Sequence, residues 1–549
     1  YIHIVNRRTH NRDTNIVISL RFNQIGNYRN WRVEEIGSDK VYHAVANDTI
    51  LIPFGPGEGK LFRATPVTKL GYGVYRTNET VSQTVTVPSG KTLKIDNGVT
   101  LNFTNGSSLA VNGGFLDLSA NTDTVRFKFN GAATRPTSNG IRINPGAQCS
   151  LKFAVITGAY IGLKGAYSSN TSIYGCRIDS NTIGLQTSNV GDAQTVFEID
   201  YSSVNYNYIG LSFDNGTGNF TNTWFRKNTI GVSAINGSLA YGYDADLSGK
   251  NRISNSLNSA LYASGYSYLD IGNEDAYDAM NTVVGNDNND ATPMFYSTIE
   301  ARHVWWGTYP ANPVYDLGIG SAFYYDPERM TAKPLQLNIE DPSGISTSGS
   351  VSMLQAKDAT DDISLKTGIE PITSLIPKEG SDPIRQLNLA RKYFAAGYYE
   401  QGAKLCKDII KENPLHVVAI QALSFLREYS KKNNPNGFSH YLSGFSSSGS
   451  FNPINSAASL IDARMDARTY EKKIDALIKK YVKRDEAVIF LYDKFAYKLF
   501  VEDKIDDATM AYLELQNQFP ENTLTKIAYA LLNPTQFSVS QNLMSTENT

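Results

Sequence analysis

Two carboxylates, Glu198 and Asp200, are the residues of this chain best spaced to do chemistry. They lie two apart in a segment predicted to be a β-strand, so they share one face, with backbone positions about 6.5–7 Å apart. Paired carboxylates near that separation can hydrolyse a glycosidic bond. Lys152 and Tyr174 are expected to be their neighbours. Acids at alternate strand positions are also common on solvated surfaces, so a catalytic role is only the second interpretation of this pair.

Other groupings of reactive residue types are weaker. The six histidines are scattered, and the chain has no serine nucleophile elbow, Walker loop or dinucleotide fingerprint. The run Asn286–Asp290 offers calcium the oxygen ligands of Asp287 and Asp290, but it lacks the spaced acids and final Glu of an EF-hand. A solvated turn is the preferred interpretation of this run, calcium is the alternative, and no other cofactor is expected.

Three tyrosines, Tyr160, Tyr174 and Tyr208, are predicted to point outward from the repeated strands. Their rings offer flat apolar surfaces that stack on sugars or on a partner protein. Tyrosine is also simply a good strand residue, which is the alternative explanation.

The elements that must position these side chains repeat along the chain. Five glycines recur at intervals of 22, 22, 26 and 21 residues, with apolar columns in register around them. A repeat of this length with period-two alternation predicts coils of a parallel β-helix, each column pointing inward and stacked about 4.8 Å from the next. The glycines are Gly140, Gly162, Gly184, Gly210 and Gly231, and the residues directly before the last four are Ile161, Ile183, Ile209 and Ile230.

Asparagines mark one corner of each coil. Asn181, Asn207 and Asn228 each stand three residues before a glycine, which predicts an asparagine ladder at a turn. In residues 83–118 the glycines recur every eight residues, between short apolar strands. Three such sides make 24 residues, so both periods predict one three-sided solenoid. A β-sandwich with accidental spacing is the alternative.

The family resemblance rests on two kinds of motif. The segment VPSGKTLKIDNGVTLNF and the pieces NTIGL and NYIGL resemble the entry and repeat of right-handed parallel β-helix proteins of the pectin-lyase-like superfamily. The resemblance covers about residues 83–330 and implies a secreted protein. The Gly-His-Gly segment of the polygalacturonases is missing, and so is the arginine with acid cluster of the pectate lyases.

The whole chain is therefore expected to be mainly β. We predict a partial β-sandwich at 1–66, a right-handed three-sided parallel β-helix at 67–330, a linker at 331–380, an α-helical region at 381–533 and a flexible tail at 534–549. The helical segments resemble tetratricopeptide units, with Pro414 and Pro520 ending two helix pairs. Multidomain proteins of this kind resemble those exported by type IX secretion, and upstream sequence is expected before residue 1.

Composition and charge limit the classes of partner that are expected. Net charge is −2 and no run of about 18 apolar residues occurs, so neither nucleic acid nor a membrane span is expected. We expect a non-catalytic extracellular or bacterial cell-surface protein for adhesion or self-assembly, with partners that include further copies of itself head to tail and other surface proteins bound through the C-terminal helices. The alternatives are a polysaccharide lyase or glycoside hydrolase on a β-helix face, and a polysaccharide-binding module.

Overall fold

The computed structural model describes residues 2–5, 16–21, most of 30–325 and most of 383–534. Its longest gaps after residue 30 are 67–71, 131–139, 189–195, 244–248, 273–280, 307–312, 326–382 and 446–451. The expected linker at 331–380 and all but the first residue of the expected tail lie outside the described residues.

The three-sided parallel β-helix is present. Each coil visits three parallel sheets in turn, which we call sheets I, II and III. Sheet II consists of β8 (Glu79–Val81), β11 (Thr100–Phe103), β14 (Val125–Phe129), β17 (Ala154–Thr157), β20 (Arg177–Asp179), β23 (Ser203–Asn205), β26 (Trp224–Arg226), β29 (Arg252–Ser254) and β32 (Thr282–Val284). Sheet III consists of β9 (Val85–Val87), β12 (Ser108–Val111), β15 (Gly140–Ile143), β18 (Ile161–Ala166), β21 (Ile183–Ser188), β24 (Ile209–Asp214), β27 (Ile230–Ile235), β30 (Ser259–Ser264) and β33 (Asn289–Pro293).

Sheet I runs the whole length of the β-helix and continues into the N-terminal strands. Its parallel part is β7 (Gly73–Tyr75), β10 (Thr92–Ile95), β13 (Phe115–Asp117), β16 (Gln148–Lys152), β19 (Asn170–Tyr174), β22 (Val196–Asp200), β25 (Thr217–Phe220), β28 (Leu239–Tyr241), β31 (Tyr268–Gly272), β34 (Thr298–Ala301) and β35 (Ala322–Tyr325). Its antiparallel part is β1 (Ile2–Val5), β6 (Gly59–Pro66), β3 (Asn30–Glu35) and β4 (Val41–Val45), and β4 meets β7.

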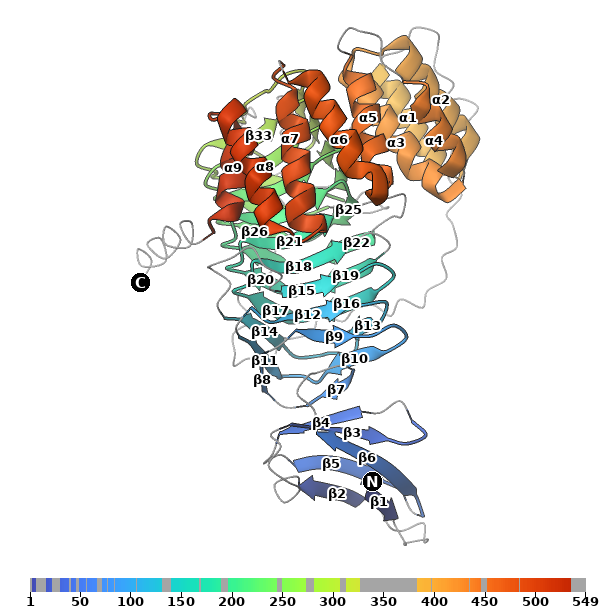
Figure 1. Ribbon diagram of the computed structural model, residues 1–549, viewed down its shortest axis with the longest axis vertical. Helices are drawn as coiled ribbons and strands as arrows, with labels where there is room; N and C mark the ends of the chain where they lie inside the picture. The colour runs from blue at the N-terminus through green and yellow to red at the C-terminus, as the bar shows by residue number, and fades with distance from the viewer. Residues whose placement is uncertain are drawn as a thin grey trace.

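The N-terminal strands form a small antiparallel unit at one end of the stack (Figure 1). A separate pair, β2 (Ile16–Arg21) with β5 (Thr49–Phe54), lies next to the four antiparallel strands of sheet I. The rings of Phe54 and Phe62 meet edge to face with centroids 6.5 Å apart, which joins the two layers. The strand β4 was not predicted from the sequence.

The predicted columns stack in register. Ile183 pairs with Ile209, and Ile209 with Ile230, on neighbouring coils of sheet III. The column directly after the glycines lies in the solenoid interior, where Leu185 and Leu211 are fully buried. The period of eight is also confirmed, because β9 to β13 occupy sheets III, I, II, III and I in order.

The asparagine ladder is confirmed at the corner between sheets II and III. Asn207 Oδ1 accepts hydrogen bonds from the backbone N–H of Asn181 at 2.9 Å and from its side-chain Nδ2 at 3.2 Å. Asn228 Oδ1 repeats both contacts with Asn207, at 2.9 and 3.1 Å. These buried amides therefore satisfy turn N–H groups that the strands leave unpaired.

From Gly162 to Gly231 the glycine column is set by a steric limit, whereas Gly140 also has a positive φ of 123°. A Cβ on Gly184 would lie 2.6 Å from the carbonyl oxygen of Gly210, and the same clash recurs between Gly162 and Gly184. Any side chain at these positions would therefore push neighbouring coils apart.

The C-terminal region is helical, as predicted. It consists of α1 (Pro383–Ala395), α2 (Tyr399–Glu412), α3 (Val417–Asn433), α4 (Pro435–Ser443), α5 (Pro453–Met465), α6 (Ala467–Tyr481), α7 (Ala487–Ala496), the π-helix η4 (Tyr497–Val501), α8 (Ile505–Gln518) and α9 (Thr523–Leu532). Helices α1 with α2 and α7 with α8 pack as the two expected pairs. Helices α3 to α6 lie between these pairs in the chain, and the relation to tetratricopeptide repeats stays a prediction.

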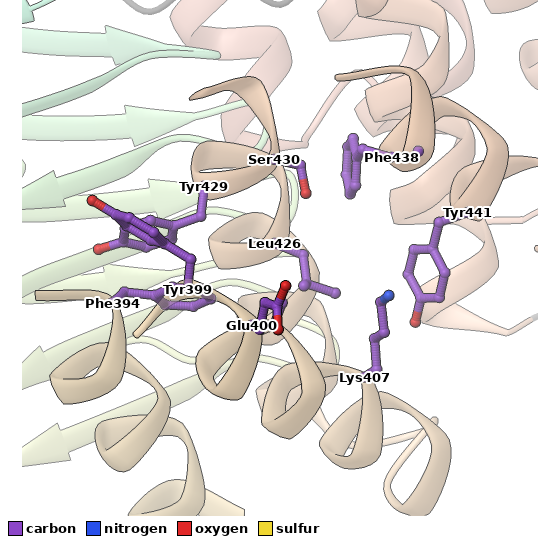
Figure 2. A pocket seen from close by; sticks show the side chains of 11 residues that line it. Phe394, Tyr399, Glu400, Lys407, Leu426, Tyr429, Ser430, Phe438 and Tyr441 are labelled. Atoms are coloured by element: carbon purple, nitrogen blue, oxygen red, sulfur yellow. The ribbon is translucent and has the colours of Figure 1, made fainter. Parts of the chain in front are cut away.

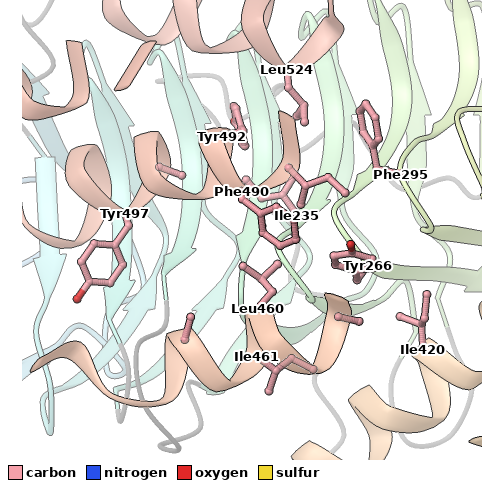
Figure 3. Packing of buried hydrophobic residues seen from close by; sticks show 14 of the residues in the cluster. Ile235, Tyr266, Phe295, Ile420, Leu460, Ile461, Phe490, Tyr492, Tyr497 and Leu524 are labelled. Atoms are coloured by element: carbon pink, nitrogen blue, oxygen red, sulfur yellow. The ribbon is translucent and has the colours of Figure 1, made fainter. Parts of the chain in front are cut away.

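The helices lie alongside the C-terminal half of the stack, where α6 to α9 cover sheet III (Figure 1). Helices α1 and α3 contact β28 and β31 of sheet I, through Arg391 with Tyr241 and Asp270 and through Phe425 with Tyr268. The cover on sheet III corrects one expectation: the column Ile161, Ile183, Ile209 and Ile230 packs with the helices rather than inside the solenoid. Figure 3 shows this packing, in which Phe490 and Tyr492 of α7, Leu460 of α5 and the solenoid side chain Ile235 belong to one cluster. None of the described helices is long and apolar enough to cross a membrane.

Candidate functional site

The acid pair lies on β22 of sheet I, with its two carboxylates in different environments. Glu198 is exposed and stands in register with Ser172 and Asn219 on the adjacent strands. Asp200 is half-buried, and its Oδ1 accepts hydrogen bonds from Thr221 Oγ1 at 2.7 Å and Asn222 Nδ2 at 2.8 Å. Asp200 thus ties two coils together at the corner of the stack.

The three tyrosines expected on outer faces separate into two groups. Tyr160 and Tyr208 are buried under the helices, which corrects the expectation that they bind a ligand. Tyr160 Oη donates a hydrogen bond of 2.8 Å to the backbone carbonyl of Leu531 in α9, and burial raises the pKa of both phenols. The sequence predicted correctly that both side chains point outward, but the C-terminal helices cover that face.

Tyr174 remains exposed and belongs to an aromatic corner that the sequence did not reveal. Its ring centroid lies 6.2 Å from Phe153 and 5.5 Å from Tyr201, and Tyr174 and Tyr201 are 38 % and 46 % exposed. We call Phe153, Tyr174 and Tyr201 the aromatic corner; it lies between sheets I and II. Phe153 and Tyr201 adopt the left-handed backbone conformation, with φ of 54° and 46°. Gly175 stands between them because a Cβ there would lie 2.7 Å from the Phe153 ring.

Charged groups border the aromatic corner on sheet I. Lys152, Tyr174 and Asp200 follow one another in register on β16, β19 and β22. Lys152 Nζ lies 5.3 Å from the centre of the Phe153 ring. Partial burial, Asp200 and Tyr201 raise the pKa of Tyr174, so its hydroxyl stays protonated. The corner therefore combines flat apolar rings with hydrogen-bonding groups, which is a combination suited to sugars.

Of the calcium candidates, Asp287 lies at the turn before β33 and Asp290 lies within β33. Asp290 Oδ1 accepts a hydrogen bond from Asn286 Nδ2 at 2.8 Å, and its Oδ2 accepts one from the Val314 backbone N–H at 3.0 Å. Asp287 is exposed. Within the described part of the chain, no group of three or more His, Cys, Asp or Glu side chains could hold a metal ion.

A buried charge cluster joins the helices to sheet III. Arg464 of α5 donates to Asp493 Oδ1 of α7 from Nε at 2.8 Å and from Nη2 at 2.6 Å, and its Nη2 lies 3.4 Å from Asp214 of β24. Tyr470 Oη donates to the other oxygen of Asp493 at 2.7 Å. These side chains are almost completely buried, so the cluster holds the two regions together in one geometry.

Two further cations of the β-helix reach the end of η4. Lys164 of β18 donates a hydrogen bond to the Phe500 carbonyl, and Arg142 of β15 pairs with Asp503. Carbonyls at a helix C-terminus attract positive charge, which explains why lysine lies there. Burial nevertheless lowers the pKa of Lys164 to about 8, against the opposing effect of Asp503.

The helices also carry a groove of about 330 Å³ between α1, α2, α3 and α4 (Figure 2). Phe394 stacks on Tyr429 along one wall, with ring centroids 3.6 Å apart. On the other wall Lys407 Nζ lies 5.4 Å from the centre of the Tyr441 ring. The groove is therefore lined mainly by aromatic rings, with Glu400 and Lys407 as its charged groups.

Comparisons with known proteins returned no match. No protein family profile matches the chain, and no curated protein or solved structure is similar to it. Function must therefore be argued from the geometry of the chain itself.

Proposed function

We propose that this protein is a non-catalytic extracellular or cell-surface scaffold that adheres to polysaccharide through its aromatic corner. The observation that carries the proposal is the exposed pair Tyr174 and Tyr201 on a rigid stack of coils. Rings fixed on strands lose little conformational freedom on binding, so they can contribute affinity without a deep pocket.

The surroundings of the aromatic corner support binding more than bond cleavage. Asp200 is engaged by Thr221 and Asn222, and Glu198 stands on an open strand surface. A general acid for glycoside hydrolysis needs a raised pKa, which usually comes from an apolar or acidic enclosure. The aromatic groove between α1, α2, α3 and α4 suits contact with a partner protein. A partner bound there would set the orientation of the β-helix.

The test is affinity electrophoresis in gels that contain soluble neutral polysaccharides, such as laminarin, arabinoxylan and hydroxyethylcellulose. The double variant Tyr174→Ala/Tyr201→Ala should bind the retarding polysaccharide at least about tenfold more weakly, a loss of about 1.4 kcal/mol. The matched control is Tyr398→Ala/Tyr529→Ala, which removes two similarly exposed tyrosines from the helices.

Equal retardation of both double variants would contradict the aromatic corner as the binding site. Release of oligosaccharides that stops in Glu198→Gln would replace the proposal with the hydrolase or lyase alternative.

A second candidate function, self-assembly, is favoured by the last coil. Val314, Tyr315, Leu317 and Ile319 are 42–57 % exposed within six residues of one another at the C-terminal end of the stack. Apolar side chains exposed together among the described residues at this end of the stack favour an end-to-end contact with another copy, which can continue into a filament. Mass measurement over a range of concentrations should show oligomers that Leu317→Lys/Ile319→Lys abolishes, and monomers at every concentration would contradict it.

A further inference from the structure

Exposed large apolar side chains outside the helices gather at the two ends of the molecule. Among the described residues before α1, nine large hydrophobic side chains are exposed, and only Tyr174 and Tyr201 of the aromatic corner lie along the stack. The other seven lie in the N-terminal unit and in the last coil, at opposite ends of the long axis (Figure 1). We call Val5, Ile36 and Leu61 the N-terminal patch, and Val314, Tyr315, Leu317 and Ile319 the C-terminal patch.

Sheet I ends in one strand at each of these ends. Among the described strands, β1 has a single neighbour, β6, and β35 has a single neighbour, β34. The Ala322 N–H donates to the Ser297 carbonyl at 3.0 Å, and successive residues of a parallel strand direct their backbone groups to opposite edges. The backbone groups of Phe323 and Tyr325 therefore face the outer edge of β35. Such an edge is a template for a further strand.

The apolar core of the solenoid reaches this same edge. Phe323 and Tyr325 pair with Ile299 and Ala301, which are buried in the core, so both point inward as its last layer. Both are only half-buried, and the Tyr315 ring of the C-terminal patch lies next to them, with centroids 5.2 Å from Phe323 and 6.0 Å from Tyr325. The described residues thus cover the end of the core incompletely.

The register of the strands shows which face of the N-terminal unit continues the core side of sheet I. Tyr75 of β7 is buried in the core, so its neighbour Val74 points outward. Paired residues of a sheet point to the same face. Val74 pairs with Tyr42 of β4, and Tyr42 with Val33 of β3. Val33 therefore lies on the outer side of sheet I, and the opposite face of β3 lies on the core side.

The N-terminal patch occupies this core side. Val33 pairs with Ala64 of β6, and Leu61 stands three residues earlier, on the opposite face. Leu61 pairs with His3, which shares its face with Val5, and the Ile36 N–H donates to the Leu61 carbonyl at 2.7 Å. The side chains of the patch are 37–47 % exposed. An exposed apolar patch thus lies on the side of sheet I that is the core side further along the stack.

The strand directions suit an antiparallel addition. β4 runs parallel to β7, and the direction reverses at each step from β4 to β3, β6 and β1. β1 therefore runs opposite to the parallel strands of sheet I. In a second copy shifted along the long axis, β1 lies antiparallel to β35 of the first, and its core side faces the same way as Phe323 and Tyr325. The N-terminal patch then meets the C-terminal patch over the end of the core.

We infer that copies of this protein join head to tail, with β1 of one copy added to the outer edge of β35 of the next and the N-terminal patch covering the C-terminal patch. The two surfaces differ, so the contact is heterologous and each copy accepts one partner at each end. The inference rests on the self-assembly given as the second candidate function, and it names the N-terminal unit as the surface that receives the last coil.

The experiment measures the mass distribution of the whole chain by analytical ultracentrifugation over a range of concentrations. The N-end variant is Val5→Lys/Leu61→Lys and the C-end variant is Leu317→Lys/Ile319→Lys, which place charge on exposed positions of one patch each. The matched control is Met510→Lys/Leu513→Lys, which changes two exposed apolar residues of α8. We expect oligomers of the wild type and the control, and monomers of either end variant alone. An equimolar mixture of the two end variants should form dimers and nothing larger, because each dimer has one intact contact and two charged ends.

Each other result contradicts a definite part of the inference. Monomers in the mixture, or assembly lost in the control, would overturn the head-to-tail contact. Oligomers of the N-end variant alone would also overturn it, while self-assembly through the C-terminal patch would stand. Monomers of the wild type at every concentration would overturn both.

Amide hydrogen exchange tests the strand addition itself. Peptides that contain β1 and β35 should exchange at least about tenfold more slowly in wild-type oligomers than in the monomeric C-end variant, because paired backbone groups are protected. Unchanged exchange of β1 in the oligomers would overturn the addition of this strand.

Discussion

The asparagine ladder provides the sharpest test of how the coils hold together. Asn207 is fully buried and donates from Nδ2 to the carbonyls of Ile178 at 3.1 Å and Asn205 at 2.9 Å, besides its contacts within the ladder. In Asn207→Ala the backbone N–H of Asn181 loses its acceptor while it stays buried, which costs about 1–3 kcal/mol. The other lost hydrogen bonds contribute about 1 kcal/mol each, so we expect a total of about 3–5 kcal/mol.

The assay must be local, because a chain with several regions does not unfold in two states. Amide hydrogen exchange of peptides that span β20 to β24 reports the opening of these coils directly. A loss of about 3 kcal/mol lowers their protection by about two orders of magnitude. The matched control is Asn102→Ala on β11, an outward and half-buried asparagine, which should change stability by less than about 0.5 kcal/mol.

Equal protection of the two variants in these peptides would refute the reasoning. It would mean that strand pairing alone fixes the corner and that the amides add no stability there.

Two further predictions concern the contact between helices and β-helix. Arg464→Met leaves Asp493 and Asp214 buried without their cation, so we expect a local loss of about 3–5 kcal/mol, whereas the exposed control Arg468→Met should be neutral. Equal amide exchange of peptides from α5 and α7 in the two variants would contradict the cluster's role. For Lys164, burial lowers the folded pKa to about 8, while the unfolded side chain titrates near 10.5. The unfolded state thus binds more protons between these values, and stability rises with pH across that window. From pH 7.5 to 9.5 the wild type should gain about 2 kcal/mol relative to Lys164→Met, compared at the same pH by amide hydrogen exchange of peptides that span β18 and η4, and a relative loss would show that this sign is wrong.

Much of the solenoid could be predicted because its coils repeat. Stacked coils place equivalent residues in register, so the columns through Ile183 and Leu185 and the ladder through Asn207 were evident from spacing alone. The helical region was predicted from its resemblance to tetratricopeptide units, with Pro414 and Pro520 at the ends of two helix pairs. Nothing in a periodic pattern, however, states which outer face a distant domain will cover.

The position of the helices explains the errors at the candidate site. Tyr160 and Tyr208 do point outward, yet α7 to α9 bury them. One signal was present: the column through Ile161 and Ile183 sits beside the glycines, and an apolar column that faces outward requires a cover. The aromatic corner was missed for another reason, since Phe153 and Tyr201 occupy left-handed corner positions that fall between the strand columns.

The helical cover also determines the order in which the coils of the β-helix unfold. Among the described residues, the hydrogen bonds and ion pairs of this cover reach from Arg142 on β15 to Tyr296 beyond β33, and they involve no coil before β15. Coils without such contacts are held only by their neighbours and, at β7, by the pairing with β4, so they open one after another. The coils that the helices contact must instead open together. We therefore expect a protease or a pulling force to open the stack coil by coil from its N-terminal side, and we expect this opening to stop at β15, where the helical cover begins.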